Sequence, residues 1–414
     1  MMYVIPYIKK NFPDKFFLWF VIFGITSLSS IFPTGIINLA FATSFFIALF
    51  LIFSSRKLNL KFESLLSFEI IGIILFAWLG FSIFWSRPES IEVSFSILWE
   101  YRIFIIAPLF SLLLRHYFIS TDLIVQIIIF STAVSLFSSI AIWANLIDLG
   151  PYVYSFKGRI FHGFVICLLV FTALNRFLVV ESKSRWLYLT LATLGIFNIL
   201  FMEIGRTGYV ALLLTIITSL IFSKPKIEKY FFMGSVIIII FAGAIFNPRL
   251  SDRLSVSKDS FQSYMEQDVK MTSIGMRLSW YDAVFKRGME NPWVGSGVGS
   301  YEVVLDELFQ EKKIDQPIDN IHSEYLNMFM MGGIISLVLF AIYIFLIFLQ
   351  GIKLWSFGKE ELGLFYLCLA VLVGLYSLLN SSFKDFGEKH VLIFVISLVS
   401  SVVENAKAKS AEIV

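Results

Sequence analysis

The chain has 414 residues, of which 58% are hydrophobic, 17% aromatic and only 15% charged, with a formal net charge of +3. Soluble proteins carry about 25% charged residues, so this composition excludes a soluble globular protein. The long uncharged stretches and 46 Phe residues predict a polytopic membrane protein. Its two cysteines, Cys167 and Cys368, lie in apolar runs, and they support neither a disulfide framework nor a cysteine metal site.

Twelve segments of the sequence resemble membrane-spanning helices, each of which needs about 20 apolar residues. A long hydrophilic segment separates the ninth from the tenth. The sequence thus predicts an all-α membrane domain with nine spans in 1–247, a large loop at 248–321, and three spans with a short tail in 322–414. The predicted spans are 16–32, 36–53, 66–85, 99–114, 122–146, 160–180, 186–203, 206–222, 230–247, 323–350, 364–381 and 390–404.

The distribution of positive charge predicts the orientation of these spans. If the N-terminus is cytoplasmic, the cytoplasmic segments hold seventeen Lys and Arg residues and the short outer loops hold six. Short cytoplasmic loops are enriched in Lys and Arg, whereas long loops follow this rule poorly. We therefore expect both termini in the cytoplasm and the large loop on the opposite face.

The large loop has two recognisable parts. In residues 275–289, Leu278, Tyr281 and Phe285 recur at near-helical spacing. The stretch "NPWVGSGVGS", 291–300, is rich in Gly and interrupted by Pro, so it predicts a turn-rich loop. Its glycines superficially resemble a nucleotide-binding loop, but no strand precedes them and no Walker A sequence is present.

Four residues carry the chemistry that the outer face could perform. Arg159, Arg206 and His322 precede or open the sixth, eighth and tenth spans, and Arg277 lies in the large loop. Arginines at that depth could bind the phosphate or pyrophosphate of a lipid-linked substrate, and histidine can accept a proton near neutral pH. Each residue also has a simpler explanation. Arg206 could extend its charged group to the membrane interface, Arg277 could be a solvated loop residue, and His322 could have only a structural role.

No metal site is predicted beside these residues. His162 and His390 also lie near the outer face, but they lack a cysteine or carboxylate partner at ligand spacing. Glu324 is more simply a solvated or hydrogen-bonded group than a second base. We expect a site without metal or cofactor.

Three stretches together resemble the superfamily of O-antigen ligases and O-antigen polymerases: "GRTGYVALLL", "TSIGMRLSWYDAVFKRGMENPWVGSGVGSYE" and "DNIHSEYLNMFMMGG". Their order and spacing carry the resemblance, over about residues 200–340. The chain departs from the family pattern at Ser323, where Asn is usual, at Met331, where an acid is frequent, and at Ser336, where Gly is frequent.

The resemblance implies a GT-C-like glycosyltransferase of the bacterial inner membrane, with its active site at the periplasmic face. Its donor would be a glycan on undecaprenyl pyrophosphate, and its acceptor a hydroxyl of lipid A–core oligosaccharide. His322 matches the family's functional histidine, while Arg206 and Arg277 match its functional arginines. Arg159 is added only for its location and charge. A single displacement with His322 as base predicts inversion at the donor carbon.

Three other functions remain open. An O-antigen polymerase uses the same donor with a second lipid-linked glycan as acceptor, and a protein O-oligosaccharyltransferase uses a Ser or Thr. The single large loop, the modest length and the lack of an appended C-terminal domain favour the ligase. A transporter or flippase would need charged groups deep in several spans, for which Glu69, Glu100 and Arg102 are the candidates.

Overall fold

The computed structural model describes residues 4–54, 65–87, 91–117, 119–149, 155–202, 205–224, 248–267 and 272–411. Every regular element in these ranges is a helix, and eight of the helices are long and apolar enough to cross a membrane. This confirms an all-α, multi-pass architecture. The predicted ninth span, 230–247, lies outside the described residues, and the total of twelve spans and the GT-C likeness remain predictions.

The helices that correspond to predicted spans mostly match them to within a few residues, but α1 begins 12 residues earlier, and α14 and α16 end six and seven residues later, than predicted. They are α1 (Val4–Leu28), α2 (Thr34–Ser54), α3 (Ser67–Phe81), α6 (Thr121–Trp143), α7 (Arg159–Val179), α8 (Arg185–Phe197), α9 (Arg206–Phe222), α14 (Glu324–Ser356), α15 (Glu360–Leu379) and α16 (Phe386–Ala411). Short turns extend two of them: the 3-10 helix η2 (Ser82–Trp85) follows α3, and the π-helix η3 (Asn198–Met202) follows α8.

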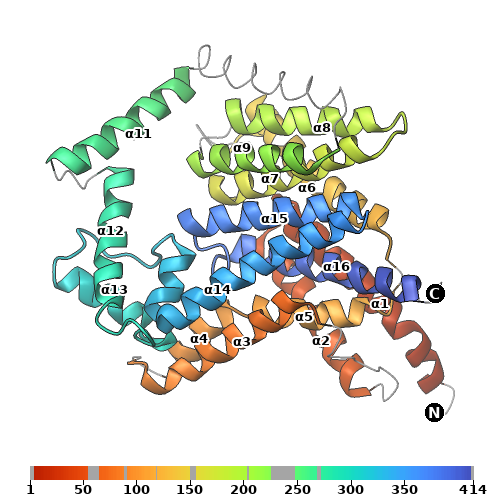
Figure 1. Cartoon of the computed structure of the whole chain (residues 1–414), viewed down its shortest axis with the longest axis horizontal. Coiled ribbons are helices and arrows are strands. Elements are labelled where there is room, and N and C mark those ends of the chain that lie inside the picture. The colour runs from red at the N-terminus through yellow and green to blue at the C-terminus, as the bar shows by residue number, and fades with distance from the viewer. Residues whose placement is uncertain are drawn as a thin grey trace.

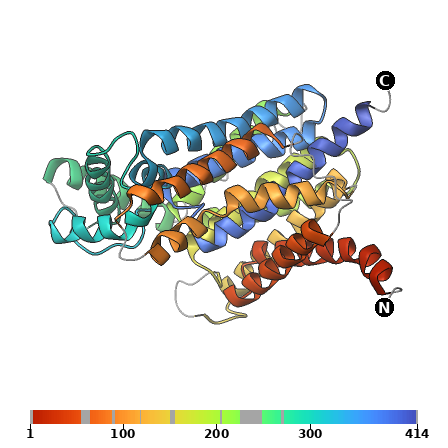
Figure 2. The same cartoon turned by 90° about the horizontal axis from the view of Figure 1, so that it is seen from below.

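Two helices, α7 and α16, form the centre of the bundle. In each, 89% of the most apolar segment is buried inside the protein, because apolar residues cover every side of the helix. Around them, α8, α6, α9 and α15 pack on α7, and α5 and α1 pack on α16. Figure 2 shows the same bundle from below, with α1 and α2 along one flank.

The fourth predicted span, 99–114, differs from the structure. The chain here forms two helices, α4 (Ile91–Glu100) and α5 (Ile103–Leu114), bent by 50° at Tyr101 and Arg102. Arg102 stabilises the bend, because its guanidinium donates a 3.0 Å hydrogen bond to the carbonyl of Trp99 at the end of α4. Arg102 is itself buried.

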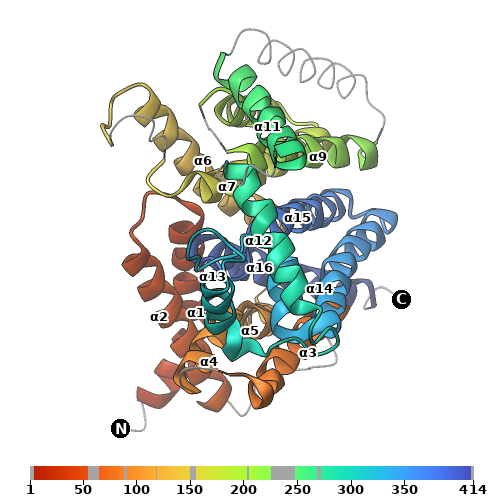
Figure 3. The same cartoon turned by 90° about the vertical axis from the view of Figure 1, so that its left-hand side faces the viewer.

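The large loop folds into helices at one end of the bundle. These are α11 (Pro248–Gln267), α12 (Ser273–Gly288), the 3-10 turn η4 (Val298–Ser300) and α13 (Tyr301–Gln310). Figure 1 shows them at the left, whereas α1 begins and α16 ends at the right. Viewed from the loop side in Figure 3, α12 and α13 lie across the ends of the bundle helices.

The glycine-rich turn of the loop docks on a break in α14. Gly333 lies inside α14 with φ of 67°, which interrupts the helix. The turn fills this interruption with backbone hydrogen bonds: Ser296 and Gly297 donate to the carbonyls of Met330 and Met331, at 2.8 and 2.9 Å. In return, Ile334 donates to the carbonyl of Pro292 at 2.7 Å. The glycines thus serve close backbone packing rather than nucleotide binding.

A serine side chain completes the break. Ser336, a position where glycine is frequent in the family that the sequence resembles, donates its hydroxyl to the carbonyl of Met328, and it also lies 3.3 Å from the carbonyl of Gly333. The indole of Trp78 donates to the carbonyl of Gly332 at 2.9 Å. The departure at Ser336 is therefore accommodated by hydrogen bonds to carbonyls that the break leaves without helical partners.

Candidate functional site

His322 is held in an uncommon backbone conformation just before α14. Its φ is 58°, a left-handed value that His, Asn and Asp adopt more readily than other non-glycine residues. The side chain of Asn320 accepts a 2.9 Å hydrogen bond from the amide of His322. From the other side, the hydroxyl of Tyr281 donates to the carbonyl of His322 at 2.8 Å. Both backbone groups of His322 are therefore fixed.

The imidazole ring of His322 is oriented by Asn380, which follows α15. Its Nδ1 lies 3.4 Å from Oδ1 of Asn380. The amide nitrogen of Asn380 faces Oε1 of Glu388 at 3.3 Å, and this contact fixes the amide oxygen toward the histidine. In this arrangement Nδ1 carries the proton and donates a hydrogen bond to Oδ1 of Asn380, so Nε2 has its lone pair available as a base.

Arg277 reaches the same turn of the chain from α12. Arg277, Trp280 and Tyr281 are spaced three and four residues apart, so they share one face of that helix. Nη1 of Arg277 lies 3.4 Å from the carbonyl of Leu379, the residue before Asn380. The ring of Trp280 stacks on His322 with centroids 6.4 Å apart. One helix face therefore brings a cation and an aromatic wall to His322.

The environment lowers the pKa of His322 below its ordinary value. Burial is the first cause, because it disfavours the charged imidazolium, and the positive charge of Arg277 is the second. The hydrogen bond to Asn380 opposes the shift. A histidine of lowered pKa is neutral at pH 7, which is the state that a general base needs.

Arg206 begins α9, and only its backbone position is described. Two residues on, Gly208 packs closely on α7: a Cβ at Gly163 would lie 3.7 Å from the Cα of Gly208 and 2.9 Å from the hydroxyl of Tyr376 on α15. Tyr376 is in the last turn of α15, the turn that ends at Leu379. The start of α9 is therefore packed against the helix that carries the Arg277 and His322 contacts.

Arg159 is placed differently. It is the first residue of α7, one turn before Gly163, and its side chain is exposed. Arg159 begins α7 and Arg206 begins α9, and these two helices pack on one another. Within the described ranges, Arg159 makes no hydrogen bond or ion pair. It remains a candidate by location only.

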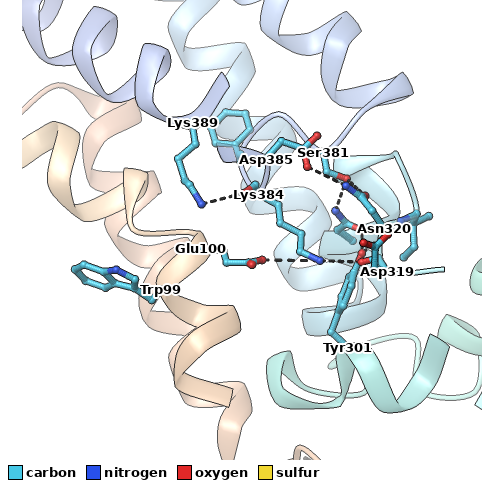
Figure 4. Close-up of polar contacts among 12 residues, drawn as sticks. Trp99, Glu100, Tyr301, Asp319, Asn320, Ser381, Lys384, Asp385 and Lys389 are labelled. Atoms are coloured by element: carbon cyan, nitrogen blue, oxygen red, sulfur yellow. Dashed lines mark hydrogen bonds and ion pairs between the residues drawn. The ribbon is translucent and has the colours of Figure 1, made fainter. Parts of the chain in front are cut away.

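A polar network joined to His322 through Asn320 supports its position, and Figure 4 shows Asn320, Ser381, Lys384 and Asp385 within it. Asn320 donates to Oδ1 of Asp385 at 2.9 Å and accepts from the hydroxyl of Ser381 at 2.6 Å. Lys384 donates to the carbonyl of Asp319 at 3.2 Å. Burial raises the pKa of Asp385 to about 6, against the lowering effect of Lys384 and of its hydrogen bonds.

The sequence reasoning missed this supporting set. Asn320 lies in the recognised motif, but Asn380, Ser381 and Asp385 come from the connection between α15 and α16, 60 residues later. The available signal was the polar run "NSSFKD", 380–385, between two apolar segments. Among the described residues, no three His, Cys, Asp or Glu side chains gather as potential metal ligands.

Comparison with known proteins agrees with the resemblance that the three sequence motifs indicated. No curated protein gives a significant match to the chain. A model of the O-antigen ligase family matches residues 190–341, a segment that contains Arg206, Arg277 and His322. The match bears out the predicted resemblance for this segment: residues 190–341 are similar to the O-antigen ligase family.

Proposed function

We propose that the protein is an O-antigen ligase, which transfers a glycan from undecaprenyl pyrophosphate to a hydroxyl of lipid A–core oligosaccharide at the periplasmic face of the inner membrane. Members of the matched family are glycosyltransferase-type enzymes, and the helical bundle suits lipid-borne substrates. The carrying observation is that Arg277 and His322 contact consecutive residues, Leu379 and Asn380, at 3.4 Å each.

The proposed reaction is a single displacement. Nε2 of His322 accepts the proton of the acceptor hydroxyl as its oxygen attacks the anomeric carbon of the donor. The bond between that carbon and the pyrophosphate oxygen breaks, and undecaprenyl pyrophosphate leaves. The positive charge of Arg277, with Arg206, stabilises the negative charge that develops on the leaving group. Attack opposite the leaving group inverts the configuration of the donor carbon.

Reconstitution tests this proposal. Purified protein in vesicles, supplied with the lipid-linked donor and lipid A–core in the presence of EDTA and without ATP, is expected to yield glycan on lipid A–core with inverted configuration. Arg277→Gln and His322→Asn are the matched variants, and both are expected to transfer glycan much more slowly than wild type. A product of retained configuration would exclude the single displacement.

The same assay separates the alternatives. Elongation of the glycan on its own carrier would identify a polymerase, and transfer to an added periplasmic protein would identify an oligosaccharyltransferase. Movement of the donor across the vesicle without transfer would identify a flippase. If the protein is a flippase, the charged bend at Arg102 would be the first region to test as part of its substrate pathway.

A further inference from the structure

A second group of cations lies on the far side of the segment that carries Asn380 and Asp385. Arg102 at the α4–α5 bend donates its Nη2 to Nε2 of His390 on α16, at 3.1 Å. Lys389 precedes His390 and is only 4% exposed. Lys157, before α7, lies 5.7 Å from the ring of Phe386, which lies 4.3 Å from the ring of His390. Arg102 thus contacts a buried histidine on which Lys389 and Lys157 also act electrostatically.

These cations have donor capacity that the described residues do not use. Nζ of Lys157 is buried and has no hydrogen-bond partner among the residues that the structure describes, and the same holds for Nε of Arg102. Lys389 donates one hydrogen bond, to the carbonyl of Lys384 at 2.9 Å, although an ammonium group has three donors. Buried donors without partners are costly, so the arrangement favours an additional acceptor.

Nearby carboxylates offset only part of this charge. Glu100 pairs with Lys384 at 3.8 Å (Figure 4) and interacts electrostatically with Lys389 and Arg102. Glu388 faces Lys157 without a hydrogen bond to it. Asp385 and Glu324 act on Lys389 from a distance, and they accept hydrogen bonds from the side chain of Asn320 and the amide of Phe383, respectively. None of these carboxylates accepts a hydrogen bond from Nζ of Lys157.

The cluster lies just below the outer surface of the bundle. The guanidinium of Arg102 lies 5.5 Å above the ring of Trp99, and that ring is exposed. Phe156, next to Lys157, is also exposed. Exposed Trp side chains such as Trp99 are typical of the depth at which lipid head groups lie. A phosphate carried by a lipid can therefore approach the cluster from the side.

We propose that Lys157, Lys389 and Arg102 form an anion subsite that binds a phosphate group of the acceptor lipid. The subsite rests on the proposed ligase function. The donor pyrophosphate is bonded to the reacting carbon, so it must lie beside His322, where Arg277 is available. The cation cluster is separated from His322 by Asn380 and Glu388. A phosphate bound at the cluster is therefore too far from the reacting carbon to be the leaving group. It fits a phosphate of the acceptor lipid, which lies several bonds from the attacking hydroxyl.

Binding of two acceptor preparations tests the subsite without requiring turnover. Lipid A–core with its phosphates and the same lipid after enzymatic dephosphorylation would be titrated into the full-length protein in detergent, with native mass spectrometry as the readout. One charge-assisted hydrogen bond is worth roughly a tenfold change in affinity. Wild type should prefer the phosphorylated acceptor by that factor, Lys157→Gln should lose the preference, and Lys157→Arg should keep it.

The controls separate the possible failures. Lys313→Gln removes an exposed lysine of the loop insertion and should bind as wild type does, while thermal unfolding reports whether Lys157→Gln and the more buried Lys389→Gln are folded. If wild type binds both acceptors equally, the proposed subsite is wrong. It is also wrong if Lys157→Gln loses affinity for the lipid-linked donor and not for the phosphorylated acceptor. If the protein binds the phosphorylated acceptor more tightly but transfers no glycan, the proposed ligase function is wrong and the proposed anion subsite still holds.

Discussion

The hydroxyl of Tyr281 donates a 2.8 Å hydrogen bond to the backbone carbonyl of His322, 41 residues later in the chain. Tyr281 shares a helix face with Arg277, so the contact joins the proposed base to the helix that carries the proposed pyrophosphate ligand. Fixing the carbonyl of His322 from α12 means that the positions of the two functional groups depend on one another.

Tyr281→Phe should therefore reduce turnover without abolishing it. A neutral hydrogen bond contributes about 1 kcal/mol, and its loss lets His322 leave its left-handed conformation, so we expect roughly a fivefold lower kcat. Tyr264→Phe, on α11 of the same loop, is the matched control. Equal kcat for Tyr281→Phe and wild type would contradict the positioning role.

Two substitutions of His322 should differ in stability and agree in activity. Asn tolerates the φ of 58°, whereas Ala in that region costs about 1–2 kcal/mol. His322→Asn should therefore unfold near the wild-type temperature and His322→Ala below it. Both should lose transfer by roughly 10²–10⁴-fold, the usual contribution of a general base. Substantial transfer by His322→Asn would assign the proton to another group.

The pH dependence of transfer should report the lowered pKa of His322. Activity is expected to fall as the pH drops through that pKa, because protonation removes the base, and the acidic limb of kcat/KM should lie below the ordinary histidine value of 6.5. Arg277→Gln removes the second-largest of the causes that lower the pKa of His322, so the acidic limb of its residual activity should move to higher pH. An unmoved limb would show that Arg277 does not act on the histidine.

Asp385 should impose its own pH dependence on stability. Its pKa is raised from 3.8 to about 6 in the folded protein, so the folded state binds a proton that the unfolded state releases. The stability due to this proton is complete below 3.8 and is lost as the pH rises through about 6. Asp385→Asn should unfold with less change across that window than wild type does in scanning calorimetry; parallel profiles would argue against a buried carboxyl.

Docking of the glycine-rich turn should be sensitive to one methyl group. A Cβ at Gly295, where φ is +65°, would lie 2.6 Å from the carbonyl oxygen of Met330 and from the amide of Gly333. Gly295→Ala should therefore destabilise the protein by more than the strain of about 1–2 kcal/mol and expose the loop to protease. Gly35→Ala, whose Cβ would meet nothing within 4 Å, should have no such effect.

The apolar runs predicted most spanning helices because length and hydropathy are local properties of the sequence. The bend at Arg102 escaped prediction, since it depends on a hydrogen bond to Trp99 and on His390 from α16. Likewise, the candidate residues Arg277 and His322 stood out by their chemistry and their motifs. Asn380 did not, because its contact with His322 joins residues 58 positions apart, and spacing in the sequence does not reveal such a pair.

The break in α14 has a consequence for the biogenesis of the protein. The carbonyls of Met330 and Met331 accept hydrogen bonds from the turn at Ser296 and Gly297, and the hydrocarbon interior offers no water to replace those donors. Because the turn is synthesised before α14, it can already have crossed the membrane when α14 emerges from the ribosome. We expect the outer end of α14 to settle only against a translocated turn, so that export of the loop becomes a checkpoint for completing the bundle.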